Sequence, residues 1–463
     1  MDIMAANTAT SAETEIRGNS LYDALRWRRS RRFAPGMAIP SGPFAYTSLY
    51  APVPLTEAEE AALAFAACGV TGYALADLAY GAGEGGQMLA GLLGRTVASP
   101  DAINTVSVVI TNDEATYLLK RPQDFAPTDF SAMVTLVQQG ALTELYHRSR
   151  TKILEGRAAP PVQPGYNFNI NRWSLYAQGG SYFLPINEIT ALYINAVLEA
   201  FDPAMGLFLV DERNHFQPAG IRRFGRSRGG HLHDDFGGGR IGTIQAIELS
   251  LAEAAAIEQG MVLQNIALMA QALGLGGFPN FARQEWGWFE ALGFRMGQMP
   301  ASRYLGAAPW LQWLLRLLRQ DQPIPIALGL ERADQVLLQP FCPPYYPTMR
   351  AAVEAFIDHK FGPQGVFRGG AAQSGWRDPA AAAAQIPAPS TAAIDATCAY
   401  CDYVYQRYGR FPAYSAPFRT VLGYQATQVD LEFYERFYQP EALSPTQRVQ
   451  WQALQRTGRL QPK

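Results

Sequence analysis

The stretch LAEAAAIEQGMVLQNIALMAQALGLGGF, residues 251–278, predicts one long helix that stops at a run of glycines. Ser250 and Glu253, at its start, have the spacing with which a hydroxyl and a carboxylate satisfy the free amides of a first helical turn. We therefore expect a helix from Leu251 to about Leu273, roughly 34 Å long, that ends at Gly274. Because apolar residues leave few polar positions on any side, the pattern predicts burial between other elements or across a subunit interface.

Shorter elements of both kinds surround this helix. Ser20 with Asp23, and Thr56 with Glu59, repeat the capping spacing and predict two earlier helices, the second of which ends at Gly69. Strands are expected at TVSVVIT (105–111), LFLV (207–210) and PIPIALGL (323–330), because these runs are short and β-rich. Since strands alternate with helices, the sequence predicts an α+β fold with a mixed sheet flanked by helices. Enlarged loops are expected at 160–185 and 225–242.

The composition excludes several classes of protein. The 463 residues are 48% apolar and 17% charged, which is typical of a globular chain. The net charge of -2 leaves no basic excess for phosphate backbones, so we expect no nucleic-acid partner. The apolar windows are shorter than the roughly 20 residues of a membrane span. With four cysteines and no signal-peptide pattern, we expect a cytoplasmic protein that has no membrane partner.

Changes in composition also predict a division into domains. Residues 1–19 are polar and small and predict a flexible arm, and residues 20–335 hold the predicted core elements. A connecting segment is expected at 336–368. The stretch 369–393 is rich in Ala, Gly and Pro and predicts a low-complexity linker. The last segment, 394–463, then looks like an appended helical and aromatic extension.

A cluster of basic residues directly follows the first predicted helix. Arg28, Arg29, Ser30, Arg31 and Arg32 combine guanidinium groups with a hydroxyl. Such groups suit a phosphate monoester, because arginine forks donate paired hydrogen bonds and serine adds a neutral donor. Two interpretations stay open from the residues alone: a solvated basic helix end, or a phosphate site.

Together with four later motifs, this cluster resembles the flavin-dependent nitroreductase superfamily. The opening motif is RRSRRF (28–33), and the later ones follow in the order that the family has. The resemblance is nearest to the branch of peptide-azoline (thiazole and oxazole) dehydrogenases. The later motifs are PLTEAEEAALAFAACGVTG (54–72), RTVASPDAINTVSVVI (95–110), EQGMVLQNIALMAQALGLGGF (258–278) and IPIALGL (324–330).

The resemblance implies a nitroreductase-like fold that holds FMN at a homodimer interface. It places the FMN phosphate at Arg28, Arg29, Ser30 and Arg32, and it places the isoalloxazine ring against the backbone of Gly274, Leu275 and Gly276. It further implies hydride transfer through flavin N5 to or from a small or peptide-derived substrate, with NAD(P)H as a candidate electron donor. It identifies no catalytic residue.

Two features limit what the resemblance implies about the substrate. The azoline-oxidising branch uses a neighbouring Lys–Tyr pair, and tyrosine follows none of the lysines here. The segment after about residue 336 has no counterpart in the minimal family domain. A second function therefore stays open, in which the chain is a catalytically inactive flavin-fold protein that serves as a binding or scaffold protein.

Two further groups of residues are weaker candidates for chemistry. His231, His233, Asp234 and Asp235 could ligate a metal, but the surrounding glycines favour a solvated loop, and we expect no metal site. Cys398 and Cys401 form a single CxxC without a second pair, which favours burial on a helix over zinc binding. GxSxG, Walker and HExxH patterns do not occur in the sequence.

Overall fold

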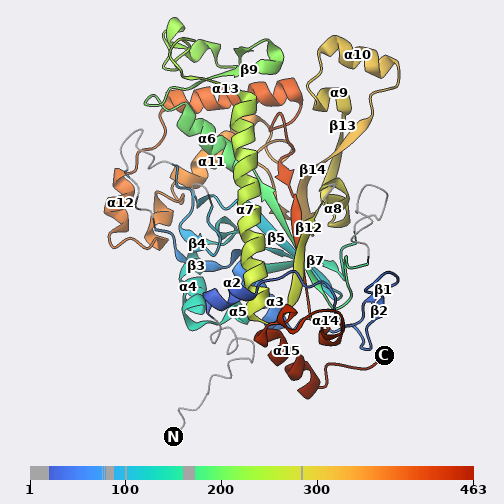
Figure 1. Ribbon diagram of the computed structural model, residues 1–463. Coiled ribbons are helices and arrows are strands. Elements are labelled where there is room, and N and C mark those ends of the chain that lie inside the picture. The colour runs from blue at the N-terminus through green and yellow to red at the C-terminus, as the bar shows by residue number, and fades with distance from the viewer. Residues whose placement is uncertain are drawn as a thin grey trace.

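A mixed sheet flanked by helices forms the centre of the computed structural model, which describes residues 20–75, 77, 79, 88–99, 102–159, 173–282 and 285–463 (Figure 1). Within these residues the sheet has seven strands, and its paired neighbours are antiparallel. The predicted α+β class is confirmed. In sheet order the strands are β12 (Gly276–Phe281), β17 (Leu422–Thr427), β8 (Ser181–Glu188), β5 (Val106–Thr111), β6 (Ala115–Leu119) and β7 (Arg150–Glu155), and β16 (Phe418–Arg419) pairs with β8.

Apolar side chains cover both faces of this sheet. In β5, Val106, Val108 and Ile110 face helices α3 (Glu57–Cys68) and α7 (Ile244–Ala272). Val109, between them, faces the opposite side and joins a cluster that contains Trp288. Because side chains alternate along a strand, a continuous apolar run such as VSVVIT supplies a core on each face. The expected strand at 105–111 and the helix that ends at Gly69 are confirmed.

Helix α7 is the long helix that the sequence predicts, but it starts about two turns earlier than expected, at Ile244. Thr243 caps it, with its hydroxyl accepting the N–H of Ala246. Ser250 instead donates to the carbonyl of Ile247 within the helix. The Ser250–Glu253 pair therefore does not mark the helix start. A hydroxyl with a carboxylate three residues later also occurs inside helices, where the hydroxyl bonds to a backbone carbonyl. Near the predicted end, Leu273 is the C-cap and Gly274 has a φ of +73°.

The C-terminal segment is part of the central sheet, which corrects the expected appended extension at 394–463. Strand β17 lies between β12 and β8, so the sheet of residues 20–335 is not continuous without it. Residues 369–393 are also not a plain linker. They contain a 3₁₀ turn at Gly369–Gln373 and helix α12 (Pro379–Gln385), which the Asp378 carboxylate caps. Composition did not reveal this because alanine-rich segments suit linkers and helices alike.

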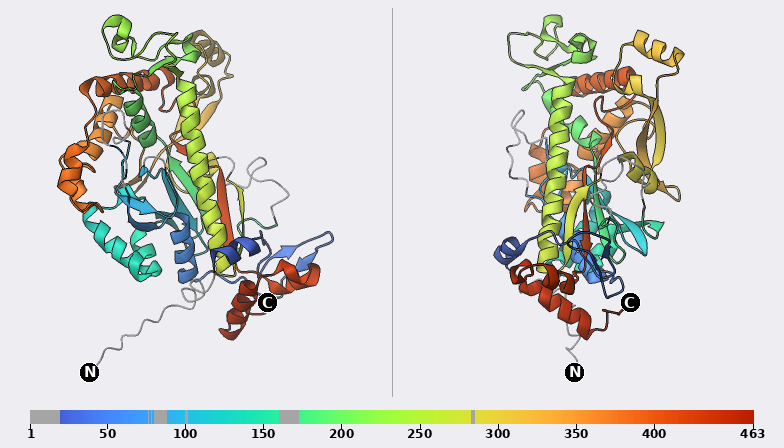
Figure 2. Two further views of the ribbon diagram at one scale, coloured as in Figure 1. Left: turned by 60° about the vertical axis from the view of Figure 1, so that its left-hand side comes forward. Right: turned by 45° about the vertical axis from the view of Figure 1, so that its right-hand side comes forward.

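Two smaller units extend from the upper end of the molecule in Figure 1. The first, here called the lobe, is residues 203–243 with β9 (Phe208–Asp211), β10 (Gln217–Pro218) and β11 (Ile241–Thr243). The second, here called the arm, is residues 295–332 with β13 (Arg295–Pro300), α9 (Ala301–Tyr304), α10 (Pro309–Leu317) and β14 (Pro323–Arg332). The views in Figure 2 show both units at the same end as the start of α7. The predicted strands at 207–210 and 323–330 are confirmed as β9 and β14.

The remaining elements surround the sheet. Ser20 caps α2 as predicted, with its hydroxyl accepting the N–H of Asp23. No helix in the described part of the chain is both long and apolar enough to cross a membrane. The predicted flexible arm, 1–19, lies outside the described residues. The first part of the predicted loop at 160–185, residues 160–172, also lies outside them. The other helices are α2 (Leu21–Trp27), α4 (Phe130–Gln139), α5 (Leu142–Ser149), α6 (Thr190–Ala200), α8 (Glu285–Ala291), α11 (Met349–Phe361), α13 (Thr391–Tyr408), α14 (Leu431–Phe437) and α15 (Pro445–Arg456), and the other strands are β1 (Ala38–Ile39), β2 (Tyr46–Thr47), β3 (Val70–Tyr73), β4 (Leu93–Arg95) and β15 (Gln335–Leu338).

Candidate functional site

The basic cluster of residues 28–32 lies beside the first residues of β12. Helix α2 ends at Trp27, and the chain then runs in extended form along the sheet edge. The N–H of Gly277 donates to the carbonyl of Arg31 at 2.8 Å. Two motifs that are far apart in the sequence, RRSRR and GLGG, thus meet in space.

A cavity of about 470 Å³ opens beside this segment, and we call it the arginine pocket. Its size is in the range of small-molecule sites. Polar and basic side chains line one part of it and aromatic rings line the other. The lining residues are Arg29, Ser30, Arg31, Arg32, Phe33, Ile39, Phe44, Trp173, Phe433, Tyr434, Tyr438 and Ala442.

Arg31 holds the segment in place. Its side chain is only 2% exposed, and its guanidinium donates to the carbonyl of Ala442 at 2.8 Å and to Gln271 Oε1 at 2.9 Å. A third, longer contact reaches the carbonyl of Trp27 at 3.4 Å. Burial lowers the pKa of Arg31 to about 10. Because these neutral acceptors already take its donors, Arg31 has a structural role in this cluster.

The other basic residues are more accessible. Arg29 and Ser30 are exposed, and Arg28 and Arg32 are half-buried. The Arg32 guanidinium lies over the ring of Phe278, 4.4 Å from its centroid. Arg29 donates to the carbonyl of Arg28 at 2.9 Å, and no described carboxylate forms an ion pair with Arg28 or Arg29.

Of the predicted phosphate-binding residues, Arg29, Ser30 and Arg32 line the arginine pocket. Arg28 is not among its described lining residues. Its charge acts instead on Tyr424 of β17, where it opposes the burial that raises the pKa of that phenol. The structure therefore brings three of the four predicted residues to one cavity.

The predicted ring-binding residues Gly274, Leu275 and Gly276 are not among the described residues that line this pocket. A Cβ built on Gly274 would lie 2.5 Å from the carbonyl oxygen of Thr446, and one on Gly276 would lie 2.8 Å from that of Arg31. Leu275 is buried in the core between α3 and α7. The chain's own C-terminal helix α15 thus covers the backbone at Gly274, while the segment that holds Arg31 covers it at Gly276.

Aromatic side chains from α14 form the opposite wall, and the sequence analysis did not identify them. The Tyr434 hydroxyl accepts the N–H groups of Arg32 at 2.8 Å and Phe33 at 3.2 Å, so it orients the basic segment. Phe33 stacks on Phe433 with ring centroids 4.1 Å apart. Burial raises the pKa of Tyr434 to about 12, so the phenol is neutral at physiological pH. The run FYERFY (433–438) is the only sequence signal for this wall.

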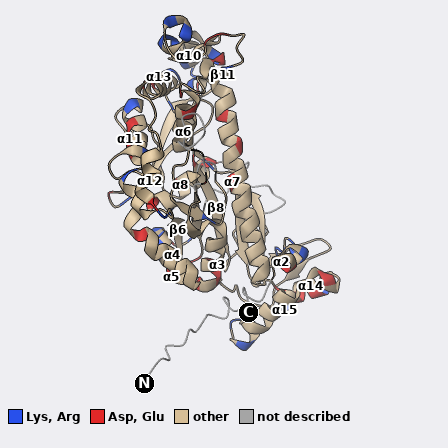
Figure 3. Cartoon of the chain, turned by 90° about the vertical axis from the view of Figure 1, so that its left-hand side faces the viewer, with Lys and Arg blue, Asp and Glu red and all other residues tan. Residues whose placement is uncertain are grey.

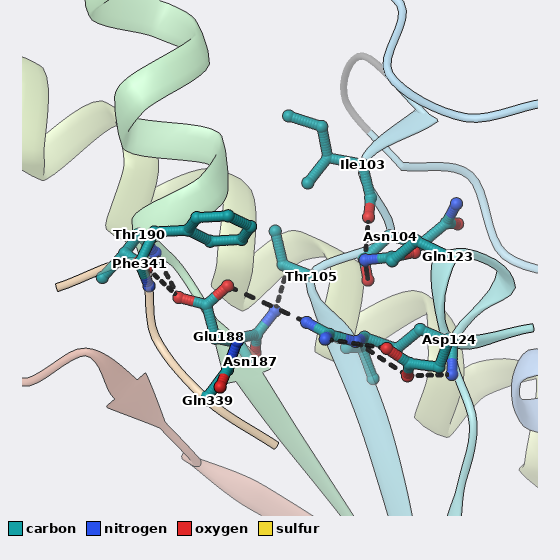
Figure 4. Close-up of polar contacts among 12 residues, drawn as sticks. Ile103, Asn104, Thr105, Gln123, Asp124, Asn187, Glu188, Thr190, Gln339 and Phe341 are labelled. Carbon is teal, nitrogen blue, oxygen red and sulfur yellow. Dashed lines mark hydrogen bonds and ion pairs between the residues drawn. The ribbon is translucent and has the colours of Figure 1, made fainter. Parts of the chain in front are cut away.

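A second cavity, of about 250 Å³, lies at the other end of β8 (Figure 4). Arg121, Asp124 and His359 are among its lining residues, and Arg121 donates to both carboxylate oxygens of Asp124. Behind it, Glu188 accepts the N–H of Thr190 at 2.6 Å, and its Oε2 lies 3.8 Å from Arg121. Burial raises the pKa of Glu188. These residues form a buried ion-pair cluster that the sequence analysis did not identify, since their positions lie far apart along the chain.

The candidate metal ligands at 231–235 make other contacts in the structure. The ring of His231 pairs with the carbonyl of Phe201 at 2.9 Å, while the Asp234 carboxylate accepts the N–H of Ser227 at 3.0 Å. Each side chain is thus held by a different neighbour. Among the described residues no three His, Cys, Asp or Glu side chains gather as metal ligands would.

Cys398 and Cys401 lie buried on α13, as expected for packing on a helix. Both are free thiols. Burial raises the pKa of each, so neither is present as a thiolate at physiological pH.

Comparisons with known proteins add little to this description of the site. No family profile matches the chain, and no curated protein matches it. Among solved structures, the chain is similar to a presumed nitroreductase from Ralstonia eutropha JMP134, with 12% identity and a TM-score of 0.29 over 60% of this chain and 77% of that one. A similarity of this size does not define a shared fold, so what the chain itself shows is an α+β protein with a pocket of arginine and aromatic side chains beside its central sheet.

Proposed function

We propose that the arginine pocket binds an aromatic phosphate monoester of the flavin mononucleotide type, and that the protein is a flavin-dependent oxidoreductase. One observation carries the proposal: basic donors and aromatic rings line the same cavity of about 470 Å³. A phosphate monoester joined to a flat aromatic ring needs both kinds of wall.

The basic wall suits the phosphate. Arg29 and Ser30 are exposed, and Arg32 lies above Phe278, so their donors are close to the pocket without being buried in the core. A phosphate monoester carries nearly two negative charges at neutral pH. Arginine donates paired hydrogen bonds to such a group, and the hydrogen bonds of the Tyr434 hydroxyl fix the backbone that carries these side chains.

The aromatic wall suits the ring. Trp173, Phe44 and Tyr438 line the pocket, and the last two stack with ring planes 4° apart. Such side chains exclude water and hold a flat ring by offset stacking. A bound flavin would supply hydride transfer, whereas the residues of this chain bind and orient it. The aromatic wall replaces the glycine backbone that the sequence resemblance implied.

The substrate, the electron donor and the oligomeric state stay predictions. A small or peptide-derived substrate, including one of the azoline kind, and NAD(P)H as donor follow only from the sequence resemblance. The homodimer rests on the apolar character of α7, where Leu249 and Ile257 are 54% and 62% exposed. Sedimentation velocity at micromolar concentration would measure the dimer directly.

The test compares three probes: FMN, riboflavin and inorganic phosphate. We expect FMN to raise the melting temperature, and riboflavin, which lacks the phosphate, to bind at least tenfold more weakly. If each charge-assisted contact contributes about 1.5 to 3 kcal/mol, Arg32→Glu should weaken FMN binding by roughly a hundredfold. Arg456→Glu, an exposed charge reversal on α15, is the matched control.

Each outcome discriminates between the two functions left open by the sequence. An Arg32→Glu variant that binds FMN as tightly as the wild type would remove this residue from the site. Wild-type protein that ignores FMN would contradict the flavin assignment. A protein that binds FMN but whose bound flavin is not reduced by NADH or NADPH would favour the binding or scaffold function.

A further inference from the structure

A concentration of exposed arginines lies at the upper end of the molecule, although the whole chain is nearly neutral. The lobe, residues 203–243, has five exposed arginines, and Asp235 is its one exposed carboxylate. No ion pair within 4.0 Å forms between these arginines and a carboxylate of the described residues. Figure 3 shows basic segments at this end, close to α10 and β11. The exposed arginines are Arg222, Arg223, Arg226, Arg228 and Arg240.

The arm beside the lobe carries an exposed apolar helix face. Trp310, Trp313 and Leu317 of α10 are 67%, 65% and 64% exposed, and no residue of α10 is buried. Their spacing of three and four residues places them on one side of the helix. Arg316 and Arg319, at the end of α10, are also exposed. An apolar stripe of this kind is unfavourable in water unless something covers it.

The lobe and the arm are held next to each other. A Cβ built on Gly306 of the arm would lie 3.0 Å from the Arg213 side chain of the lobe. Within the arm, Ser302 of α9 donates its N–H and its hydroxyl to the carboxylate of Asp321, just before β14, at 2.8 and 2.6 Å. The arginines and the tryptophan face therefore belong to one end of the molecule, as Figures 1 and 2 show.

We propose that this end, which we call the basic-aromatic end, docks on the surface of a membrane that contains anionic lipids. Amphipathic helices bind such surfaces with Trp and Leu at the boundary of the acyl chains, while arginines contact the headgroup phosphates. Both components are present here: the α10 face and the arginines of the lobe. The contact requires no membrane-spanning segment.

Charge complementarity favours a lipid surface over two other partners. A second copy of the chain, paired through the same face, would bring two sets of exposed arginines together, and like charges at short range repel. A nucleic acid would neutralise the arginines and could stack on the tryptophans. It would leave the aliphatic residues Leu305 and Leu318, which are 66% and 54% exposed, without an apolar environment.

The sequence predicts no membrane partner, and the reason for the difference is local. Its short apolar windows exclude a span, and the net charge of -2 averages over all the charged residues. Neither quantity shows that exposed arginines and exposed tryptophans share one end. Only the folding of residues 203–243 and 295–332 places them together.

The experiment is co-sedimentation of the full chain with two kinds of vesicle, phosphatidylcholine alone and phosphatidylcholine with about 30% phosphatidylserine. We expect at least tenfold stronger binding to the anionic vesicles. Raising NaCl from about 0.1 M to 0.5 M should weaken that binding at least tenfold, because salt screens exposed charges. Equal binding to both vesicles, or no binding to either, would overturn the proposal.

Variants test whether the vesicle contact is made by the basic-aromatic end. Trp310→Ser with Trp313→Ser, and separately Arg226→Glu with Arg228→Glu, should each reduce binding at least tenfold. The matched control is Arg377→Glu with Arg456→Glu, which reverses two exposed charges, one just before α12 and one on α15, away from this end. All variants alter exposed residues, and circular dichroism checks that they fold.

The rival partners are measured in the same preparation. Salt-dependent binding of a DNA duplex at the affinity seen for anionic vesicles would favour nucleic acid and overturn the lipid assignment. Concentration-dependent dimerisation that the tryptophan variant abolishes would instead identify a second copy as the occupant. Loss of vesicle binding in the control variant would show that the attraction is not specific to the basic-aromatic end.

Discussion

Replacement of Arg31 by methionine should separate the structural arginine of the basic cluster from those that line the arginine pocket. The side chain joins two distant parts of the chain, since its guanidinium donates to the carbonyl of Ala442 after α14 and to Gln271 of α7. The backbone carbonyl of Arg31, which accepts from Gly277 of β12, is not changed by the substitution. Methionine fills a similar volume but donates no hydrogen bond. The substitution therefore leaves the carbonyl of Ala442 and Gln271 Oε1 without this donor.

The size of the effect follows from these acceptors. A buried polar group that loses its partner costs about 1 to 3 kcal/mol, so two acceptors predict a loss of about 2 to 6 kcal/mol. Part of this loss is offset because the guanidinium charge no longer has to be buried. We expect a net decrease of about 2 to 4 kcal/mol in the free energy of unfolding. Arg29→Met, at an exposed position, should change the free energy of unfolding by less than about 0.5 kcal/mol.

The assay is urea unfolding followed by far-UV circular dichroism, in which a lower midpoint at an unchanged slope measures stability alone. A double-mutant cycle with Gln271→Leu should show a coupling energy of at least about 1 kcal/mol, because the two side chains share a hydrogen bond. The reasoning is refuted if Arg31→Met loses less than about 1 kcal/mol, or if Arg29→Met loses as much. It is also refuted if the cycle shows no coupling.

Three further predictions concern other parts of the molecule. Burial raises the pKa of Glu285 to about 7 from its usual 4.5, so the folded state keeps a proton that the unfolded chain releases, and the free energy of unfolding should fall as pH rises through this window. Glu285→Gln should accordingly stabilise by about 1 to 3 kcal/mol at pH 8 and by almost nothing at pH 5, and equal effects in urea titrations at both pH values would contradict this. Deletion of residues 416–463 should abolish cooperative thermal unfolding, because it removes β16 and β17 from the sheet, whereas a truncated chain that melts cooperatively would show that the C-terminal segment is an appendage. All four cysteines are buried, so a thiol reagent should label them rapidly only in denaturant, and fast labelling of the native protein would count against their burial.

Local patterns in the sequence predicted the elements that local interactions stabilise. The capping pairs at Ser20 and Thr56 mark real helix starts, and the apolar runs at 105–111 and 323–330 form strands. Gly274 ends α7 in the left-handed conformation that glycine adopts most readily. In each case the deciding contacts lie within a few residues of each other, so the sequence carries the information directly.

The candidate site was predictable only in part. The chemistry of Arg29, Ser30 and Arg32 indicated a phosphate site, and the structure places these residues on one cavity. Arg31 has the same chemistry and yet has a structural role, because burial and neutral acceptors decide what a guanidinium does. The aromatic run from Phe433 to Tyr438 is visible in the sequence, but nothing there shows that it forms a wall of the pocket, since its approach to residues 29–33 depends on how α14 packs.

The sequence by itself determined the α+β class, the long apolar helix and the basic cluster, because periodicity, capping and residue chemistry are local properties. Tertiary structure alone decided that residues 422–427 complete the central sheet, that α15 covers Gly274, and that arginines and tryptophans share one end. These features depend on pairing between residues that lie far apart in the sequence. Such pairing is selected by the burial of apolar surface over the whole chain, and no short window of sequence contains it.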